Sequence, residues 1–195
     1  MRRLSLPQLN SILCIGAHAD DIEIGCGGTL LRLLEEQPGV EVFWLVVTGD
    51  QVREIEARES AEAFLSDREK LTFECWRQRD GFLPYDGAAV KEKFRELQER
   101  VSPDLVFTHR LEDRHQDHRF LSEMVWNSFR DQLILEYEIP KYEGDLGNPS
   151  TFVELSSTHA EKKKTLLMEH FASQRSKTWF TAENFEALMR IRGLE

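Results

Sequence analysis

Over the first 130 residues, apolar runs alternate with stretches whose apolar residues recur at helical spacing. The runs at residues 11–17 and 40–48 are nearly continuous, as strands covered on both faces should be. Two further strands are predicted at residues 70–76 and 104–108. The stretches between them predict helices from residue 29 to Pro38-Gly39, over about residues 53–65, from Val90 to Pro103 and after residue 118 through Phe129.

This alternation predicts an α/β fold that is Rossmann-like, with three layers and a mostly parallel central sheet. Beyond residue 130 the pattern weakens. The elements expected there are strands at 133–139 and 151–155, a loop at 141–150, and helices near 159–172 and 182–191. Neither a repeat nor a linker interrupts the sequence, so residues 1–195 are expected to form one domain.

Charge and composition disfavour several classes of protein. The 41% of hydrophobic residues is typical of a globular chain, and the formal net charge of −10 opposes binding to nucleic acid or an anionic membrane. No apolar run reaches membrane-spanning length, and no secretory signal follows Arg2 and Arg3. Cys14, Cys26 and Cys75 do not suggest a disulfide framework. We therefore expect a cytoplasmic protein without nucleic-acid or membrane partners, and leave a homo-oligomer open.

Candidate chemistry is concentrated in two strings, His18-Ala19-Asp20-Asp21 and His115-Gln116-Asp117-His118. They follow the first and fourth predicted strands, which adjoin at the switch point of a doubly wound sheet, so we expect them to share a pocket. Three histidine and carboxylate ligands suit a divalent ion such as zinc and leave one position for water, with a further carboxylate as general base. Each string alone would be read as a polar turn or a structural histidine. Together they predict a metal-dependent hydrolase.

Residues 17–29, Ala-His-Ala-Asp-Asp-Ile-Glu-Ile-Gly-Cys-Gly-Gly-Thr, resemble the first signature of the PIG-L/LmbE family of zinc-dependent de-N-acetylases. Residues 113–119, Asp-Arg-His-Gln-Asp-His-Arg, resemble the second. The resemblance extends through Asp80-Gly81 and the Ser173-Gln174 region. It implies hydrolysis of an acetamide on an amino sugar, a small-molecule substrate.

The resemblance also implies a role for each residue of the two strings. The metal ligands would be His18, Asp21 and His118, holding Zn²⁺, although Fe²⁺ or another divalent ion suits the same side chains. Asp20 would be the general base. His115 would stabilise the oxyanion and help to protonate the departing amine, and Asp117 would fix the tautomer of a histidine through a hydrogen bond.

Two residues outside the strings occupy places similar to substrate-contacting residues of the family. These are Arg58 and Asp80. For Arg58, an exposed helix salt bridge with Glu54 or Glu62 is an equal alternative, because such pairs are common. Asp80 precedes a glycine and could instead be a turn former. We expect Asp80 to accept a hydrogen bond from a sugar hydroxyl.

The sequence departs from the family pattern at three places. Ala19 stands where the family usually has proline, which loosens the turn without removing a ligand. Residues 48–50 replace a longer Gly-Glu segment, which puts substrate contacts there in doubt. The sequence stops at Glu195, where relatives often continue toward the pocket, so the site is expected to be more open unless the chain is truncated.

These residues favour four candidate functions to different degrees. The leading one is a zinc-dependent deacetylase of an N-acetylglucosamine-type conjugate. The runner-up is an amidase of the same chemistry that cleaves a larger acyl group or a thiol conjugate. An inactive, metal-bound sugar-binding domain would not need Asp20 and His115. A nucleotide-binding protein is disfavoured because the glycines after the first strand lack the phosphate-binding spacing.

Overall fold

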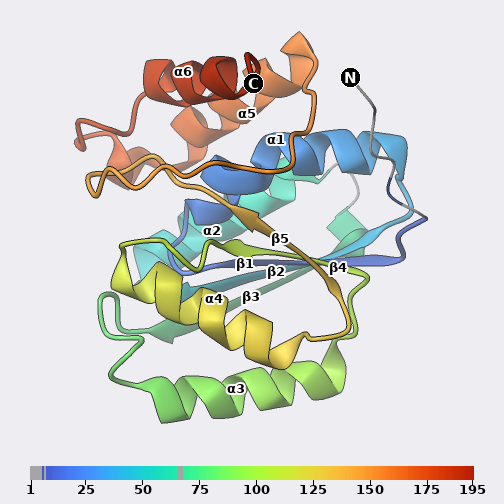
Figure 1. The fold of residues 1–195 in the computed structure, drawn as a ribbon, viewed down its shortest axis with the longest axis vertical. Helices are drawn as coiled ribbons and strands as arrows, with labels where there is room; N and C mark the ends of the chain where they lie inside the picture. Colours follow the sequence, from blue (N-terminus) through green and yellow to red (C-terminus); the bar gives the residue numbers. More distant parts are fainter. Residues whose placement is uncertain (1–5, 7, 66–67) are drawn as a thin grey trace.

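The computed structural model describes residue 6 and residues 8–65 and 68–195. Within this part of the chain, five parallel strands form one sheet in the order β3-β2-β1-β4-β5 (Figure 1). The strands are β1 (Ser11–Gly16), β2 (Glu41–Thr48), β3 (Leu71–Gln78), β4 (Leu105–His109) and β5 (Leu133–Tyr137). The predicted α/β fold and the pairing of the first strand with the fourth are confirmed.

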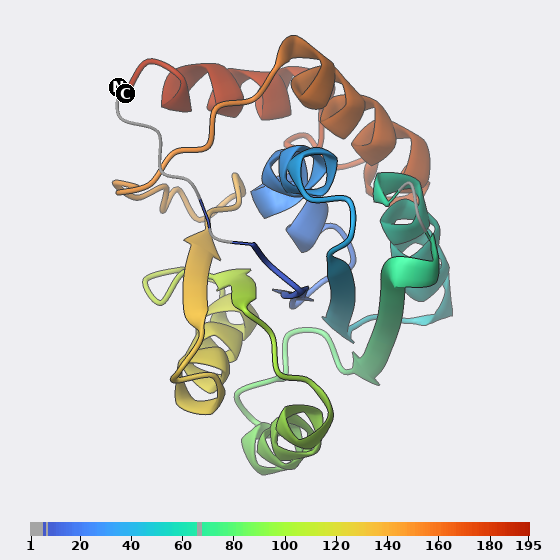
Figure 2. The ribbon, with the colours of Figure 1, turned by 90° about the vertical axis from the view of Figure 1, so that its right-hand side faces the viewer.

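Helices cover both faces of the sheet (Figures 1 and 2). One face carries α3 (Gly87–Arg100) and α4 (Gln116–Ser128), and the other carries α1 (Asp21–Glu36) and α2 (Gln51–Phe64). Outside α1 lie α5 (Ser157–His170) and α6 (Ala182–Arg192), which contact each other and arch over it in Figure 2. Two short 3-10 turns span Arg68–Lys70 and Ala172–Gln174. Among the described residues, no helix has the length and apolar character needed to cross a bilayer.

Alternate residues of the central strand β1 contribute to two separate cores. Ile12 and Cys14 belong to the cluster beneath α1, whereas Leu13 and Ile15 belong to the cluster against α3 and α4. All four are at most 1% exposed. Successive side chains of a strand point to opposite faces, so a strand covered on both faces must be apolar throughout. This is the physical basis of the continuous apolar run in the sequence.

Helix α1 begins at Asp21, earlier than the predicted start at residue 29. The glycines that the sequence assigned to a lead-in lie inside the helix. Because they have no Cβ, neighbouring side chains can pack directly against the helix backbone. A Cβ at Gly25 would overlap the ring of Tyr137, and a Cβ at Gly28 would lie 2.5 Å from Cδ1 of Leu155. The early start puts Asp21 in the first turn, at the end of the helix that faces the carboxyl ends of the strands.

Residues 151–155 do not form the predicted strand. The segment runs extended across the outside of α1 instead, as the orange trace of Figure 1 shows. The carbonyl of Glu154 accepts a hydrogen bond from Nη1 of Arg32 at 2.8 Å, and Leu155 packs against Gly28. Contacts with a helix therefore take the place of pairing with a strand.

Candidate active site

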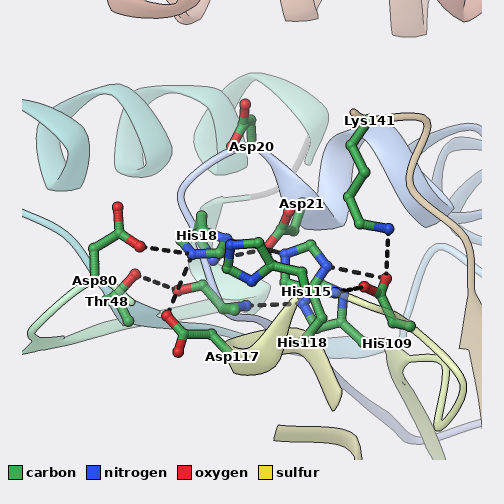
Figure 3. Close-up of polar contacts among 12 residues, drawn as sticks. His18, Asp20, Asp21, Thr48, Asp80, His109, His115, Asp117, His118 and Lys141 are labelled. Carbon is green, nitrogen blue, oxygen red and sulfur yellow. Dashed lines mark hydrogen bonds and ion pairs between the residues drawn. The ribbon is translucent and has the colours of Figure 1, made fainter. Parts of the chain in front are cut away.

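Polar residues meet at the carboxyl ends of four strands (Figure 3). The first string follows β1, Thr48 ends β2, Asp80 follows β3, and His109 ends β4. The second string spans the loop after β4 and the first turn of α4. Because β1 and β4 are neighbours, residues almost a hundred positions apart converge at the switch point, as the sequence predicted.

The three predicted metal ligands form a compact triangle of donor atoms. Nδ1 of His18 lies 3.2 Å from Oδ2 of Asp21 and 3.0 Å from Nε2 of His118, and the last two atoms are 3.3 Å apart. Ligand atoms about 2.0–2.2 Å from a tetrahedral zinc lie roughly 3.3–3.6 Å from one another. The donor types and the spacing both fit a divalent ion. We call these three residues the metal triangle.

His109 is a buried histidine of this cluster to which the sequence assigned no partner. Its Nε2 accepts a hydrogen bond from the backbone N–H of Ala17 at 3.0 Å and lies 3.2 Å from Oδ2 of Asp21. Its ring stacks on that of His118 with centroids 3.9 Å apart. Burial, with His118 close by, lowers the pKa of His109 to about 4. The lowered pKa favours a neutral ring, and with Asp21 and His118 this histidine forms another group of side chains whose atoms could hold a metal ion.

A second layer of charge orients His118. Its Nδ1 lies 3.1 Å from Oδ2 of Asp113, and that same oxygen accepts from Nζ of Lys141 at 3.0 Å. The other oxygen of Asp113 accepts from the backbone N–H of His115 at 2.8 Å. Although burial alone raises it, these donors hold the pKa of Asp113 well below its usual range. An ionised Asp113 beside Nδ1 orients the ring of His118 so that its Nε2 points to the other two residues of the metal triangle.

Asp20 is 4% exposed, and its two oxygens have different surroundings. Oδ1 accepts from Nη2 of Arg53 at 2.8 Å, whereas Oδ2 has no hydrogen-bond partner among the described residues. Burial raises the pKa of Asp20 and outweighs the opposing effect of Arg53. A buried carboxylate with one free oxygen, next in sequence to a metal-triangle residue, has the form of a proton acceptor.

The other predicted residues divide into those at the pocket and one outside it. His115 is part-buried, with its ring centroid 4.8 Å from that of His18, and burial lowers its pKa. Asp117 accepts from the backbone N–H of Gly81 at 2.6 Å, and its Oδ2 lies 3.6 Å from Nε2 of His18. Asp80 also faces that nitrogen, with Oδ1 at 3.0 Å.

Arg58 does not reach the pocket. Its guanidinium lies 3.5 Å from Oε1 of Glu54 and over the ring of Phe73, 4.5 Å from the centroid. Arg53, five residues earlier, lines the pocket instead. Five residues turn an α-helix by about 500°, so the two arginines point about 140° apart. Asp50 caps α2 by accepting from the N–H of Arg53 at 2.9 Å, which places Arg53 in the first turn, at the pocket.

The family model described as GlcNAc-PI de-N-acetylase matches residues 13–129, which include both strings. The chain belongs to this PIG-L family. Membership supports a de-N-acetylase as the activity of the chain.

Solved structures that share the fold of this PIG-L chain include enzymes that catalyse different reactions. The conserved protein TT1542 from Thermus thermophilus has a TM-score of 0.70 at 24% identity, covering 94% of this chain and 88% of that one. The N,N'-diacetylchitobiose deacetylase from Pyrococcus horikoshii has 0.64 at 22%, covering 94% and 76%. GalB, a 4-carboxy-2-hydroxymuconate hydratase from Pseudomonas putida, has 0.74 at 17%, covering 95% and 86%. These likenesses show the fold, so the reaction must be argued from the site.

In this PIG-L chain the site opens into a cavity of about 610 Å³. The metal triangle and Asp20 form its floor, and Arg79 and Asp80 stand on the β3 side. Lys177 and the edge-to-face pair Tyr142 and Trp179, with ring centroids 6.3 Å apart, form the opposite wall. Near the end of β3, Arg77 has a φ of 51°. The pairing of β2 with β3 is irregular at this point. The residues that follow this irregularity, Gln78, Arg79 and Asp80, line the cavity.

Proposed function

We propose that the chain is a metal-dependent hydrolase that removes the acetyl group from an N-acetylglucosamine-type sugar conjugate. The observation that carries this proposal is the metal triangle, whose donor atoms lie 3.0–3.3 Å apart in a cavity that Asp20 also lines. Family membership supports the amide bond as the target.

His18, Asp21 and His118 would hold the ion, and zinc is our candidate because two imidazoles and one carboxylate suit it. When bound, zinc lowers the pKa of water and polarises a carbonyl oxygen. The protein's own contribution begins with Asp20, whose Oδ2 is free to accept the proton of the attacking water. Burial raises the pKa of this carboxyl, which favours its holding a proton once it has taken one.

His115 lines the cavity beside His18 and His118, which places it to stabilise the oxygen of the tetrahedral intermediate. Products are acetate and a free amine, and the amine must gain a proton as the C–N bond breaks. We assign this proton to Asp20, which returns the one it took from water to the departing nitrogen, with His115 assisting the transfer. Asp117 holds the loop that begins at Gly81 and faces His18.

The sugar would lie between the two walls of the cavity. Asp80 on the β3 side is placed to accept from a sugar hydroxyl, and Trp179 on the opposite wall offers an apolar ring face. The cavity of about 610 Å³ leaves room for the group attached to the sugar. Arg53, which lines the cavity, is placed to contact the substrate in the way that the sequence predicted for Arg58.

Acetate release tests the proposal. Zinc-loaded protein is incubated with a panel of N-acetylglucosamine conjugates that differ in the attached group, with N-acyl analogues of longer chain beside them. We expect acetate from at least one conjugate and none after treatment with a chelator. Release of only longer acyl groups would instead favour the amidase function, and no release of any acyl group by metal-bound protein would contradict the proposal.

A further inference from the structure

Glu56 lies at the centre of a chain of polar contacts that ends at Asp20. It is 8% exposed on α2. Its Oε1 accepts from the backbone N–H of Ser173 at 2.9 Å, and its Oε2 accepts from Oγ of Ser173 at 2.7 Å. Oε2 also accepts from Nη1 of Arg53 at 2.8 Å, while Nη2 of Arg53 donates to Oδ1 of Asp20 at 2.8 Å. These polar contacts thus link the start of α1, helix α2 and the turn after α5.

The guanidinium of Arg53 is divided between two carboxylates. An arginine fork fits both oxygens of one carboxylate, and a bidentate pair is its strong arrangement. Here Nη1 is held by Glu56 and by Oγ of Ser173 at 3.1 Å, so only Nη2 reaches Asp20. The second oxygen of Asp20 is left without a partner among the described residues. This oxygen is the one that the proposed mechanism uses.

We propose that Glu56 is a positioning residue that keeps this oxygen free. By engaging one arm of Arg53, it restrains the guanidinium to a single oxygen of Asp20. Without the negative charge at Glu56, Nη1 is released and the pair with Asp20 becomes bidentate, which occupies both oxygens. Glu56 is not among the residues that line the cavity, so its effect on Asp20 is exerted through Arg53. This inference rests on the proposed role of Asp20.

Glu56 also anchors the far wall of the cavity, because Ser173 precedes Gln174, Lys177 and Trp179 along the chain. The two effects can be separated. Glu56→Gln keeps an acceptor oxygen for the backbone N–H of Ser173 but loses the charge that holds Arg53. Ser173→Ala removes the hydroxyl contacts but leaves the pair between Arg53 and Glu56 in place.

The experiment compares these two variants under metal-loaded conditions. For Glu56→Gln we expect kcat to fall at least about tenfold, with KM within about threefold of the unmodified protein and metal content unchanged. Glu59→Gln, an exposed site on the same helix, should keep kcat within about threefold, and Ser173→Ala, which leaves the Arg53–Glu56 pair in place, should lower kcat less than Glu56→Gln does. Glu56→Asp retains the charge and should recover part of the lost kcat. A Glu56→Gln variant that folds, binds metal and keeps full kcat would overturn the proposal.

A double-mutant cycle isolates the fork of Arg53. Lysine has a single ammonium and cannot form the two-armed pair, so adding Glu56→Gln to Arg53→Lys should cost much less than adding it to the unmodified protein. Equal costs in both backgrounds would contradict the argument.

A crystal structure of Glu56→Gln gives a readout that needs no activity. Both Nη atoms of Arg53 should lie within hydrogen-bond distance of the Asp20 carboxylate. Arg53 remaining on Oδ1 alone would overturn the inference. Because this result does not depend on turnover, a protein that releases no acetate would contradict the proposed function without deciding the role of Glu56.

Discussion

Nδ1 of His18 and Nε2 of His118 lie 3.0 Å apart, although 100 positions separate the two histidines in the chain. Oδ2 of Asp21 lies within 3.3 Å of both nitrogens. The adjacency of β1 and β4 brings them together, and the early start of α1 directs Asp21 to the same point.

Removing a residue of the metal triangle should abolish metal binding. We expect about one zinc ion per chain in the loaded protein and well below that in His118→Ala and Asp21→Ala, because two remaining ligands hold zinc poorly. Metal content after dialysis, measured by mass spectrometry, checks this. His159→Ala, which changes a histidine on α5, is the matched control and should keep the ion. Full metal content in both triangle variants would place the ion elsewhere.

Asp113 should tune the affinity for metal without binding it. Its Oδ2 faces Nδ1 of His118 at 3.1 Å and is also paired with Lys141. Loss of such an outer contact lowers metal affinity about 10–100-fold, and we expect a decrease of that size for Asp113→Asn. Competition with a chromophoric chelator measures it. The neighbouring exposed Glu112→Gln is the control, and equal affinities for the two variants would argue against the orienting role.

Trp179 should contribute to substrate binding rather than to the chemical step. It lines the cavity in an edge-to-face pair with Tyr142. Aromatic contacts contribute about 0.5–1.5 kcal/mol, so Trp179→Ala should raise KM roughly 2- to 10-fold with little change in kcat. Steady-state kinetics on the best conjugate checks this. Trp126→Ala, at an exposed position on α4, should leave both constants unchanged. A loss confined to kcat would contradict the binding role.

Lys163 should make stability depend on pH in the alkaline range. Lys163 lies on α5, and its buried ammonium donates to the carbonyl of Ile24 of α1 at 2.6 Å. Burial lowers the pKa of Lys163 from 10.5 to about 8, which corresponds to about 3 kcal/mol against the charged form. Between pH 8 and 10.5 the unfolded chain binds more protons at this group than the folded chain does. Its contribution therefore makes the free energy of unfolding rise with pH across that window and stay constant below it.

Lys163→Met tests this sign. The difference in unfolding free energy between variant and unmodified protein, from urea titrations, should favour the variant most at pH 7 and shrink toward pH 10.5. Lys162→Met, on the exposed side of the same helix, should show no such trend. A difference that is constant over this range would contradict the lowered pKa.

The fold and the convergence of the two strings could be predicted from the sequence because both depend on local patterns, whereas the choice of His18, Asp21 and His118 as ligands came from the family resemblance. Continuous apolar runs identify strands covered on both faces, and a topological rule then brings the two strings together. The predicted strand at 151–155 was wrong because its apolar residues are not buried in a sheet: Phe152 and Val153 are exposed, and Leu155 packs against Gly28 of α1.

The outer part of the site could not be predicted in the same way. Arg53 and Arg58 differ only in their position around α2, and the start of that helix at Gln51 decides which of them faces the cavity. Lys141 comes from a loop without periodicity, yet it contacts Asp113 behind His118. Such contacts depend on how distant loops pack, which a single sequence does not encode in any local pattern.

The most direct test of the account is acetate release by metal-loaded Asp20→Asn beside the unmodified protein. Asparagine retains an oxygen for Nη2 of Arg53 but cannot accept the proton of the attacking water. General-base catalysis contributes about 10²–10⁴-fold, so we predict a loss of kcat of that size at unchanged metal content. A metal-bound Asp20→Asn variant that turns over at the unmodified rate would contradict the central claim that Asp20 activates water beside the metal triangle.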